Sequence, residues 1–471
     1  MIPLELRLAL VFLIGACLGS LVNWAIYALA WHSRPISPWS RGPIDAPPRR
    51  RADRIPILGW LGLRREAHVH GRGFWIRPLL LELGLGVALA ALYWWEVERL
   101  GLIQTQVGFA IAPPLGPLHW QFVAHTLLLC WMLAASFIDI DEKIIPDEIT
   151  VTGTLLGLVL ATVVPISLLP HVAERPAPPV VGQLIHTAAG VPARGPGGNP
   201  LWLEPVTAVA PEAWPPAWGQ PRRWQSLAVA LACYWLWCFA LAPRIWRGRR
   251  GVAFALQLIV RRVAREFGRP PLRWLLLAGT AAVVCVWAFG DAAWAGLMTA
   301  LVGLVASGGI VWGVRLMGSA ALRREAMGFG DVTLMMMVGT FLGWQACVIA
   351  FFLAPFAALV VGIAQFLFRR DDVIPYGPFL CMASSAVVVA WAPIWIWAQN
   401  LFAAGALVPA VLVVCLVLLG AMLAIWQMIK TALFGGRDAI TRDELYFTTE
   451  GTADTEEEQN RDEKAGMRDE G

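Results

Sequence analysis

The sequence predicts an all-α protein, a polytopic bundle of transmembrane helices. Two features of its composition point there: the 471 residues are 58% hydrophobic, and only 15% are charged, whereas a soluble domain usually carries about 25% charged residues. A third feature is the 25 Trp residues, since indoles are favoured at the membrane–water interface.

Apolar runs predict eleven membrane spans, two of them short. They cover residues 4–30, 78–98, 121–138, 150–169, 224–243, 274–289, 293–314, 332–346, 347–368, 376–397 and 401–430. The first run follows no basic start and is long enough to cross a bilayer at ~1.5 Å per residue. We therefore expect a retained helix there and not a cleaved signal peptide.

Arginine sets the predicted orientation of these spans. Residues 32–77 hold ten Arg against three acidic residues, and residues 243–273 hold nine Arg against one Glu. Such an excess marks cytoplasmic loops, so both segments are predicted to lie inside. Residues 100–120 carry no charged side chain and are predicted outside. Because successive spans alternate in direction across the membrane, Asp139 and Asp331 are then predicted at the cytoplasmic ends of their helices.

The segments between and after the spans differ in composition. Residues 171–223 hold 11 of the 33 Pro, which predicts an irregular external loop. Residues 251–268 mix an apolar face with Arg and are expected along the inner interface. The acidic tail 437–471 is predicted to be disordered. The net charge of +4 comes with no basic soluble domain, so nucleic acid is not expected as a partner.

The first motif that could carry chemistry is SFIDIDEKIIPDEIT, from Ser136 to Thr150. An apolar helix runs into Asp139, and Pro146 ends the polar link that follows. Asp147 can cap the next helix, because its carboxylate can accept a bond from the free amides of the first turn.

The second motif is EAMGFGDVTLMMM, whose Gly328 and Gly330 flank Phe329 and lead directly into Asp331. Glycine allows close approach of backbones. An aspartate where a membrane helix begins is functional by default if it faces the bundle interior.

Two carboxylates placed against each other share a proton and titrate as one unit. The ionised group can take a proton from water while the neutral one polarises a scissile carbonyl, with no metal and no covalent nucleophile. From the residues alone, two alternatives stay open. One is a transporter or channel that uses the pair as a proton or cation site. The other is a catalytically silent assembly component.

Both motifs resemble those of type IV prepilin peptidases. FIDIDEKIIPDEIT is similar to the family's first catalytic Asp motif, and MGFGDVTLMMMVGTFLGW to its G-x-G-D motif. Four further segments resemble the family in the same order: GACLGSLVNWAIY, DRIPILGWLGLR, IRPLLLELGLG and VIPYGPFL. Together the matches cover roughly residues 1–170 and 293–397.

The resemblance implies about eight family-like helices and about three extra ones. The implied parts are an N-terminal helix, Arg-rich loop and second helix (1–99), the two halves of the peptidase domain (121–170 and 293–397), an insertion with a Pro-rich external loop and an extra helix pair (171–292), a terminal helix (401–430) and the tail (437–471).

The implied function is that of an aspartic endopeptidase of the bacterial inner membrane, with its active site on the cytoplasmic side. It would cleave leader peptides of type IV pilin-like or type II secretion pseudopilin precursors within the lipid bilayer. By motif position Asp139 and Asp331 would be catalytic, with Asp147, Gly328 and Gly330 in support. Proteolysis would need no cofactor. In many members the same enzyme then methylates the new N-terminus with S-adenosylmethionine.

The chain departs from the family pattern in its cytoplasmic loop and after its second Asp. Many members carry two C-x-x-C pairs that bind zinc in this loop, but residues 32–77 contain no Cys. His32, His68 and His70 are interpreted as polar loop residues, so no zinc or other metal is predicted. The missing pairs also argue against the methylation step. Thr333 stands where Lys often follows the G-x-G-D motif.

Overall fold

A computed structural model describes residues 3–42, 45–103, 111–242, 270–322, 327–367 and 375–434. Among these residues eight helices are long and apolar enough to cross a membrane, or nine if one bent pair is counted as a span. The predicted all-α transmembrane bundle is thereby confirmed, and the chain is a multi-pass membrane protein. The predictions for 251–268 and 437–471 lie outside the described residues.

The chain divides into two compact units. The first comprises residues 1–313 and 327–411, and the second residues 314–326 and 412–471.

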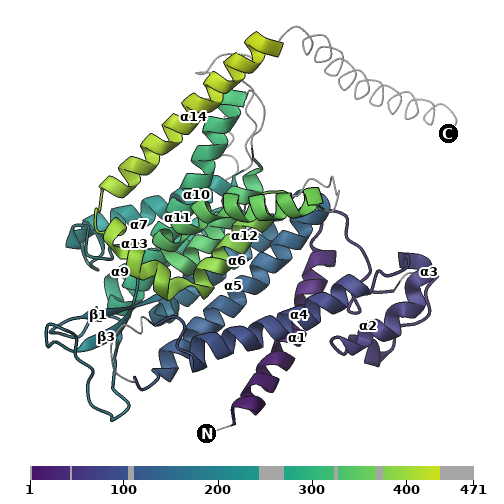
Figure 1. The fold of residues 1–471 in the computed structure, drawn as a ribbon, viewed down its shortest axis with the longest axis horizontal. Helices are drawn as coiled ribbons and strands as arrows, with labels where there is room; N and C mark the ends of the chain where they lie inside the picture. Colours follow the sequence, from purple (N-terminus) through teal and green to yellow (C-terminus); the bar gives the residue numbers. More distant parts are fainter. Residues whose placement is uncertain are drawn as a thin grey trace. The chain divides into compact units, whose positions relative to one another are not determined.

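The N-terminal part of the first unit contains α1 (Leu4–Ala28), α4 (Ile76–Tyr93) with a π-helical extension (η3, Trp94–Glu98), α5 (Leu115–Glu142) and α6 (Asp147–Val163). Glycine lets α1 lie directly on α4 (Figure 1). A Cβ added to Gly15 would lie 2.8 Å from the Cα of Gly86, and one on Gly19 would lie 2.7 Å from the Cα of Glu82. A larger side chain at either position would push the two helices apart.

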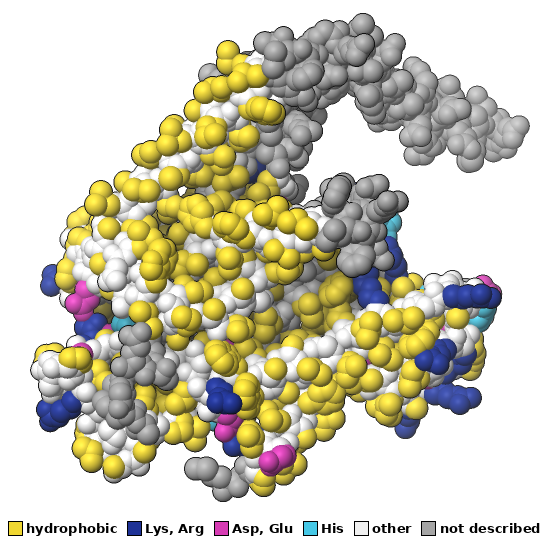
Figure 2. Space-filling model, viewed as in Figure 1, with side chains coloured by type: hydrophobic (Ala, Val, Ile, Leu, Met, Phe, Trp, Pro, Cys, Tyr) yellow, Lys and Arg dark blue, Asp and Glu magenta, His cyan; other side chains and the backbone are white. Residues whose placement is uncertain are grey.

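Short helices join α1 to α4 through the Arg-rich segment: η1 (Arg51–Arg54), α2 (Leu58–Leu63), η2 (Arg64–Glu66) and α3 (Ala67–His70). Figure 2 shows Lys and Arg side chains gathered over this region, whereas hydrophobic side chains cover the long helices. The outer faces of those helices therefore suit contact with lipid.

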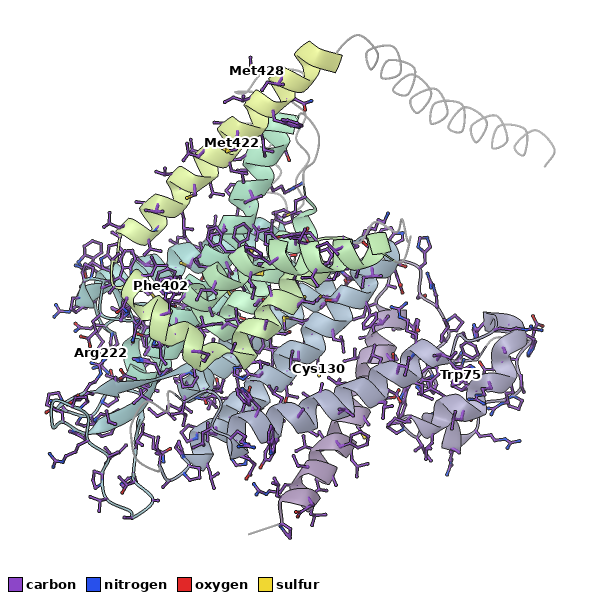
Figure 3. All side chains as sticks on the ribbon, viewed as in Figure 1. Trp75, Cys130, Arg222, Phe402, Met422 and Met428 are labelled. Carbon is purple, nitrogen blue, oxygen red and sulfur yellow. The ribbon has the colours of Figure 1, made fainter. Side chains whose placement is uncertain are left out.

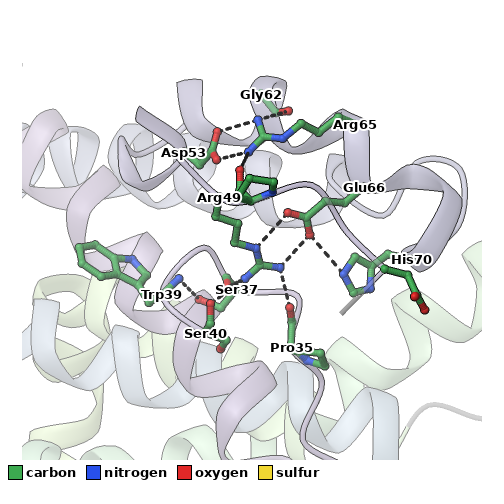
Figure 4. A network of polar contacts seen from close by, with 12 residues as sticks. Pro35, Ser37, Trp39, Ser40, Arg49, Asp53, Gly62, Arg65, Glu66 and His70 are labelled. Carbon is green, nitrogen blue, oxygen red and sulfur yellow. Dashed lines mark hydrogen bonds and ion pairs between the residues drawn. The ribbon is translucent and has the colours of Figure 1, made fainter. Parts of the chain in front are cut away.

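A buried ion pair organises this segment (Figure 4). The Arg49 guanidinium donates to both carboxylate oxygens of Glu66, at 3.0 and 2.8 Å, and also to the backbone carbonyl of Pro35 at 2.7 Å. His70 lies 3.4 Å from the same carboxylate, which is fully buried. A buried charge is tolerated where it is paired and hydrogen-bonded, so polar contacts hold together a loop that contains no cysteine.

The C-terminal half of the chain supplies α7 (Trp224–Leu241), α9 (Pro270–Phe289), α10 (Asp291–Leu322), α11 (Phe329–Leu367), α12 (Gly377–Val389), α13 (Trp391–Phe402) and α14 (Leu407–Phe434). In the second unit α14 packs on the end of α10, where a Cβ added to Gly420 would lie 3.2 Å from Met317 Sδ. Met422 and Met428 project from α14 and are exposed (Figure 3), as expected of lipid-facing side chains.

The structure contains two breaks in its apolar segments. Within α11 the backbone leaves the helical conformation at Gly343, with φ 76° and ψ 173°, three residues before the end of the predicted span 332–346 and close to the boundary predicted with the span 347–368. The predicted span 376–397 is two helices, α12 and α13, bent by 95°. Hydropathy does not detect the bend between α12 and α13, because the residues on both sides are equally apolar.

The prediction that 171–223 is irregular was wrong for part of this segment. It contains a three-stranded antiparallel sheet in the order β1 (Pro170–Glu174), β3 (Leu201–Pro205), β2 (Gln183–Leu184). Leu201 and Leu203 alternate along β3 and are buried in a cluster with Tyr93 and Leu118. Side chains two positions apart point to the same face of a strand, so both leucines pack into this cluster. The many prolines of the segment fall at strand ends and in loops.

Hydrogen bonds fix the polypeptide after this sheet onto the membrane helices. The amide of Ala208 donates to Thr299 of α10 at 3.0 Å, and its carbonyl accepts from Trp344 Nε1 of α11 at 2.9 Å. Gln345 donates to the carbonyl of Thr207 at 2.8 Å. The two bonds from α11 come from the side chains of Trp344 and Gln345, which immediately follow the break at Gly343.

Candidate active site

Asp139 lies in the last turn of α5, and its position follows from how that helix ends. Lys143 adopts a left-handed conformation (φ 57°), and its amide donates to the carbonyl of Asp139 at 2.8 Å. A residue in this conformation commonly closes a helix. The chain then runs through Ile145 and Pro146 into α6, so the motif forms a tight helix–loop–helix around the aspartate.

Asp331 lies in the first turn of α11, two residues after Phe329. Gly330 packs directly on Ile145 of the first motif, because a Cβ added to Gly330 would lie 3.0 Å from Ile145 Cβ. At Gly328 the nearest atom to an added Cβ is Asp331 Oδ2 at 3.7 Å, an ordinary contact distance. A side chain at 330 would therefore press on Ile145, whereas one at 328 would meet only an ordinary contact; the supporting roles of both glycines stay predictions.

The two aspartates meet at Gly377, the first residue of α12. A Cβ added to Gly377 would lie 2.5 Å from Asp139 Oδ2 and 3.1 Å from Asp331 Oδ1. The two carboxylate oxygens are therefore no farther apart than the sum of these distances. The side chains are almost completely shielded from solvent, with 4% and 6% of the two residues exposed. Residues 192 positions apart in the sequence thus form one buried acidic pair.

The surrounding helices fit closely enough to fix this pair. α5, α6 and α12 all pack against α11. A Cβ added to Gly157 of α6 would lie 2.0 Å from Thr340 Oγ1, and one on Gly153 would lie 2.3 Å from Met337 Sδ. The small residues of α6 therefore bring the first motif against the helix that carries the second Asp.

Hydrogen bonding around the pair is incomplete. The backbone of Gly377 interacts with the Asp139 carboxyl group, but Asp139 Oδ2 has no hydrogen-bond partner among the described residues. A buried polar atom without a partner is costly unless water or a ligand satisfies it. The pair thus offers an acceptor for a water molecule or for a substrate group.

Asp147 does not act as the predicted cap. The N-cap residue of α6 is Pro146, without a side-chain capping bond, and Asp147 is the first helical residue. Its side chain is exposed, unlike those of the acidic pair. The helix dipole still favours a carboxylate in this first turn. The supporting role of Asp147 remains a prediction.

Two neighbours of the pair were not predicted as site residues. Gly377 provides the space in which the carboxylates meet. Tyr376, immediately before it, lies close enough to Asp331 to interact with its carboxylate. A phenol can donate a hydrogen bond in the site. Both residues belong to VIPYGPFL, a segment that resembles the family but had suggested no role.

Thr333, which replaces the Lys often found after this motif, donates to the carbonyl of Gly330 at 3.1 Å. It therefore brings no charge to the pair. In the part of the chain that the structure describes, no group of three or more His, Cys, Asp or Glu side chains could hold a metal ion. That zinc is not required stays a prediction, as does the involvement of S-adenosylmethionine.

Comparison with known proteins identifies the segments that carry this pair. The model of the type IV leader peptidase family matches residues 126–177 and 270–363, which contain Asp139 and Asp331. It leaves residues 178–269 unmatched.

Curated relatives match over shorter stretches. A prepilin leader peptidase/N-methyltransferase of Myxococcus xanthus is 28% identical over 150 residues, which cover 32% of this chain and 39% of the relative. A protein of the same description from Xanthomonas campestris is 28% identical over 120 residues, which cover 26% of this chain and 35% of the relative. One from Aeromonas salmonicida is 32% identical over 87 residues, which cover 18% of this chain and 30% of the relative.

The aligned part thus spans well under half the length of these relatives. No solved structure matches. The two matched segments contain the paired aspartates, and over these segments the chain is similar to the type IV leader peptidase family, in agreement with the resemblance drawn from the motifs.

Proposed function

We propose that the protein is a membrane aspartic endopeptidase that removes leader peptides from type IV pilin-like or type II secretion pseudopilin precursors. The observation that carries this proposal is the convergence of Asp139 and Asp331 at Gly377 in a buried position. The names of the relatives support the choice of substrate, since each is described as a prepilin leader peptidase.

The chemistry follows from two carboxylates that share one proton. The ionised carboxylate takes a proton from water as the water oxygen attacks the scissile carbonyl carbon, and the neutral carboxylic acid donates its proton to the carbonyl oxygen. The tetrahedral intermediate then collapses, the C–N bond breaks, and the amine leaves with a proton returned through the pair. Either aspartate can start as the acid, because the pair titrates as a unit.

The position of the pair favours proteolysis over transport. Asp139 lies three residues before the end of α5, and Asp331 two residues after the start of α11. An ion pathway needs polar groups across the hydrophobic core, and ionisable groups there mark such paths. A pair at the helix ends instead suits a peptide bond near the membrane surface.

We place the pair on the cytoplasmic side of the bacterial inner membrane. The Arg-rich segment 32–77, expected inside by its charge, connects to the same end of the bundle: Arg77 of α4 contacts Asp141, two residues after Asp139. A precursor would present its leader from the cytoplasm while its apolar helix stays in the bilayer. The proposal does not extend to methyl transfer.

The test is co-expression with pilin-like precursors encoded in the same genome, followed by N-terminal sequencing of the product. The wild-type chain is expected to yield a shortened precursor, and Asp331→Asn to insert equally well but leave the precursor intact. Asp291→Asn is the matched control, because Asp291 is an exposed residue that pairs with Arg222 away from the acidic pair. Full processing by Asp331→Asn would reject the proposal.

A further inference from the structure

Asp141, two residues after Asp139, connects the last turn of α5 to α4. Nη1 of Arg77, at the start of α4, donates to both carboxylate oxygens of Asp141, at 2.8 and 2.9 Å. The same guanidinium lies over the ring of Phe137, with Cζ 4.6 Å from the ring centre. One side chain of α4 therefore contacts α5 both before and after Asp139.

Glu142 ties the same turn to the end of α1. Its carboxylate accepts hydrogen bonds from the backbone amides of Trp31, at 2.6 Å, and His32, at 3.1 Å. Trp31 and His32 follow α1 directly. A carboxylate that holds two backbone amides from a distant segment fixes the end of one helix against the other.

The geometry of an α-helix separates these contacts from the acidic pair. Phe137 and Asp141 are four residues apart and share one face of α5. Asp139 is two residues from each and so points to roughly the opposite face, at ~100° per residue, toward Gly377 of α12. The contacts to α1 and α4 therefore hold the back of the turn that presents Asp139.

We propose that Arg77 and Asp141 are positioning residues that hold the end of α5 so that Asp139 meets Asp331. The inference rests on the proposed peptidase function and adds to it residues that do not touch the reacting atoms. A rigid support of this kind matters because catalytic groups must be held to a fraction of an ångström.

Because the ion pair is partly exposed, its effect on catalysis can be measured separately from its effect on the stability of the fold. The Arg77 and Asp141 side chains are 37% and 19% exposed, and ion pairs of this exposure contribute little to folding. Because one nitrogen of Arg77 contacts both oxygens of Asp141, the ammonium of a lysine can replace it. Loss of charge should therefore impair catalysis, whereas Arg77→Lys should preserve it.

The experiment measures cleavage of a purified precursor by purified full-length variants. Arg77→Gln and Asp141→Asn are expected to lower kcat about 10-fold or more with KM within about twofold, and Arg77→Lys to stay within about threefold of wild type. The double variant should be no slower than the slower single variant, since both remove one interaction. Melting temperatures should remain near the wild-type value.

Glu98→Gln is the matched control. Arg7 and Glu98 also join α1 to the extension of α4, with similar exposures of 27% and 25%, but at the end of α1 away from Trp31. This variant should cleave at the wild-type rate.

Three results would overturn the inference. A rise in KM at constant kcat would make Asp141 a substrate contact. A fall in kcat that is matched by a fall in melting temperature and not rescued by lysine would make the pair structural. Wild-type kinetics in both variants would leave it without a role. Failure of the proposed function is distinct, because Asp331→Asn would then still process the precursor.

Discussion

Replacing Gly377 with alanine should inactivate the protein without unfolding it. The added Cβ would lie 2.5 Å from Asp139 Oδ2, 3.1 Å from Asp331 Oδ1 and 3.2 Å from Ile145 Cδ1. Real Cβ atoms essentially never approach another atom within 3.0 Å, and ordinary contact begins at 3.4 Å. The Asp139 carboxylate must therefore move by about 1 Å, a misplacement that can lower a rate about 100-fold.

The fold should tolerate this change. Gly377 is the first residue of α12 and has no positive φ, so alanine fits the backbone without strain. The assay is the initial cleavage rate of a purified precursor, normalised to the amount of monodisperse protein in detergent.

Gly84→Ala on α4 is the control, since no described atom lies within 4 Å of a Cβ added there. It should cleave at the wild-type rate. Wild-type activity in Gly377→Ala would show that the space between the two carboxylates is not used in catalysis, and the geometric argument would fail.

Three further predictions concern stability. Arg49→Met leaves the buried Glu66 carboxylate without its cation and should destabilise the protein by about 3–5 kcal/mol, seen as a lower melting temperature; an unchanged value would show that the ion pair does not hold the loop. Gly157→Ala places a Cβ 2.0 Å from Thr340 Oγ1 and should cost about 1–3 kcal/mol by overpacking α6 against α11, whereas melting at the wild-type temperature would refute that contact. Burial lowers the pKa of His171 to about 4, while an unfolded His titrates near ~6.5; the β-sheet should thus be stable above that pH and lose stability as pH falls toward 4. Between pH 7 and pH 5, the hydrogen-exchange protection of β1 and β3 should fall more in the wild type than in His171→Phe. Equal changes in the two proteins would show that the pH dependence does not come from His171.

The sequence is sufficient to predict the bundle and the position of both aspartates at helix ends. Asp139 and Asp331 stand where long apolar runs stop and start, and the structure has them in the last turn of α5 and the first turn of α11. Side-chain hydropathy determines where a helix can cross a membrane, so these positions follow from local composition.

Features that depend on tertiary contacts were not predictable in this way. A span boundary was predicted close to the break at Gly343, but the hydrogen-bond partners of Trp344 and Gln345 beside it come from residues 207–210, more than 130 positions away. The alternation of Leu201 and Leu203 is too short to stand out among the prolines of its segment. Arg49 and Glu66 look like solvated loop charges until the fold buries them together.

The candidate site shows the same limit. The two aspartates could be named from their motifs, but the point at which they meet could not. Gly377 comes from a third segment, VIPYGPFL, that carries no acidic or basic residue, and only the packing of α12 against α5 and α11 places it between them. The capping role expected of Asp147 failed because Pro146 occupies the N-cap position.

The central claim is that Asp139 and Asp331 act as one catalytic unit, and single-turnover cleavage rates test it most directly. Asp139→Asn, Asp331→Asn and the double variant should all lower the rate by about the same large factor, on the order of 10⁴ or more, because groups that act as a unit are strongly non-additive. Independent effects that multiply in the double variant, or a single variant that cleaves at the wild-type rate, would contradict the account.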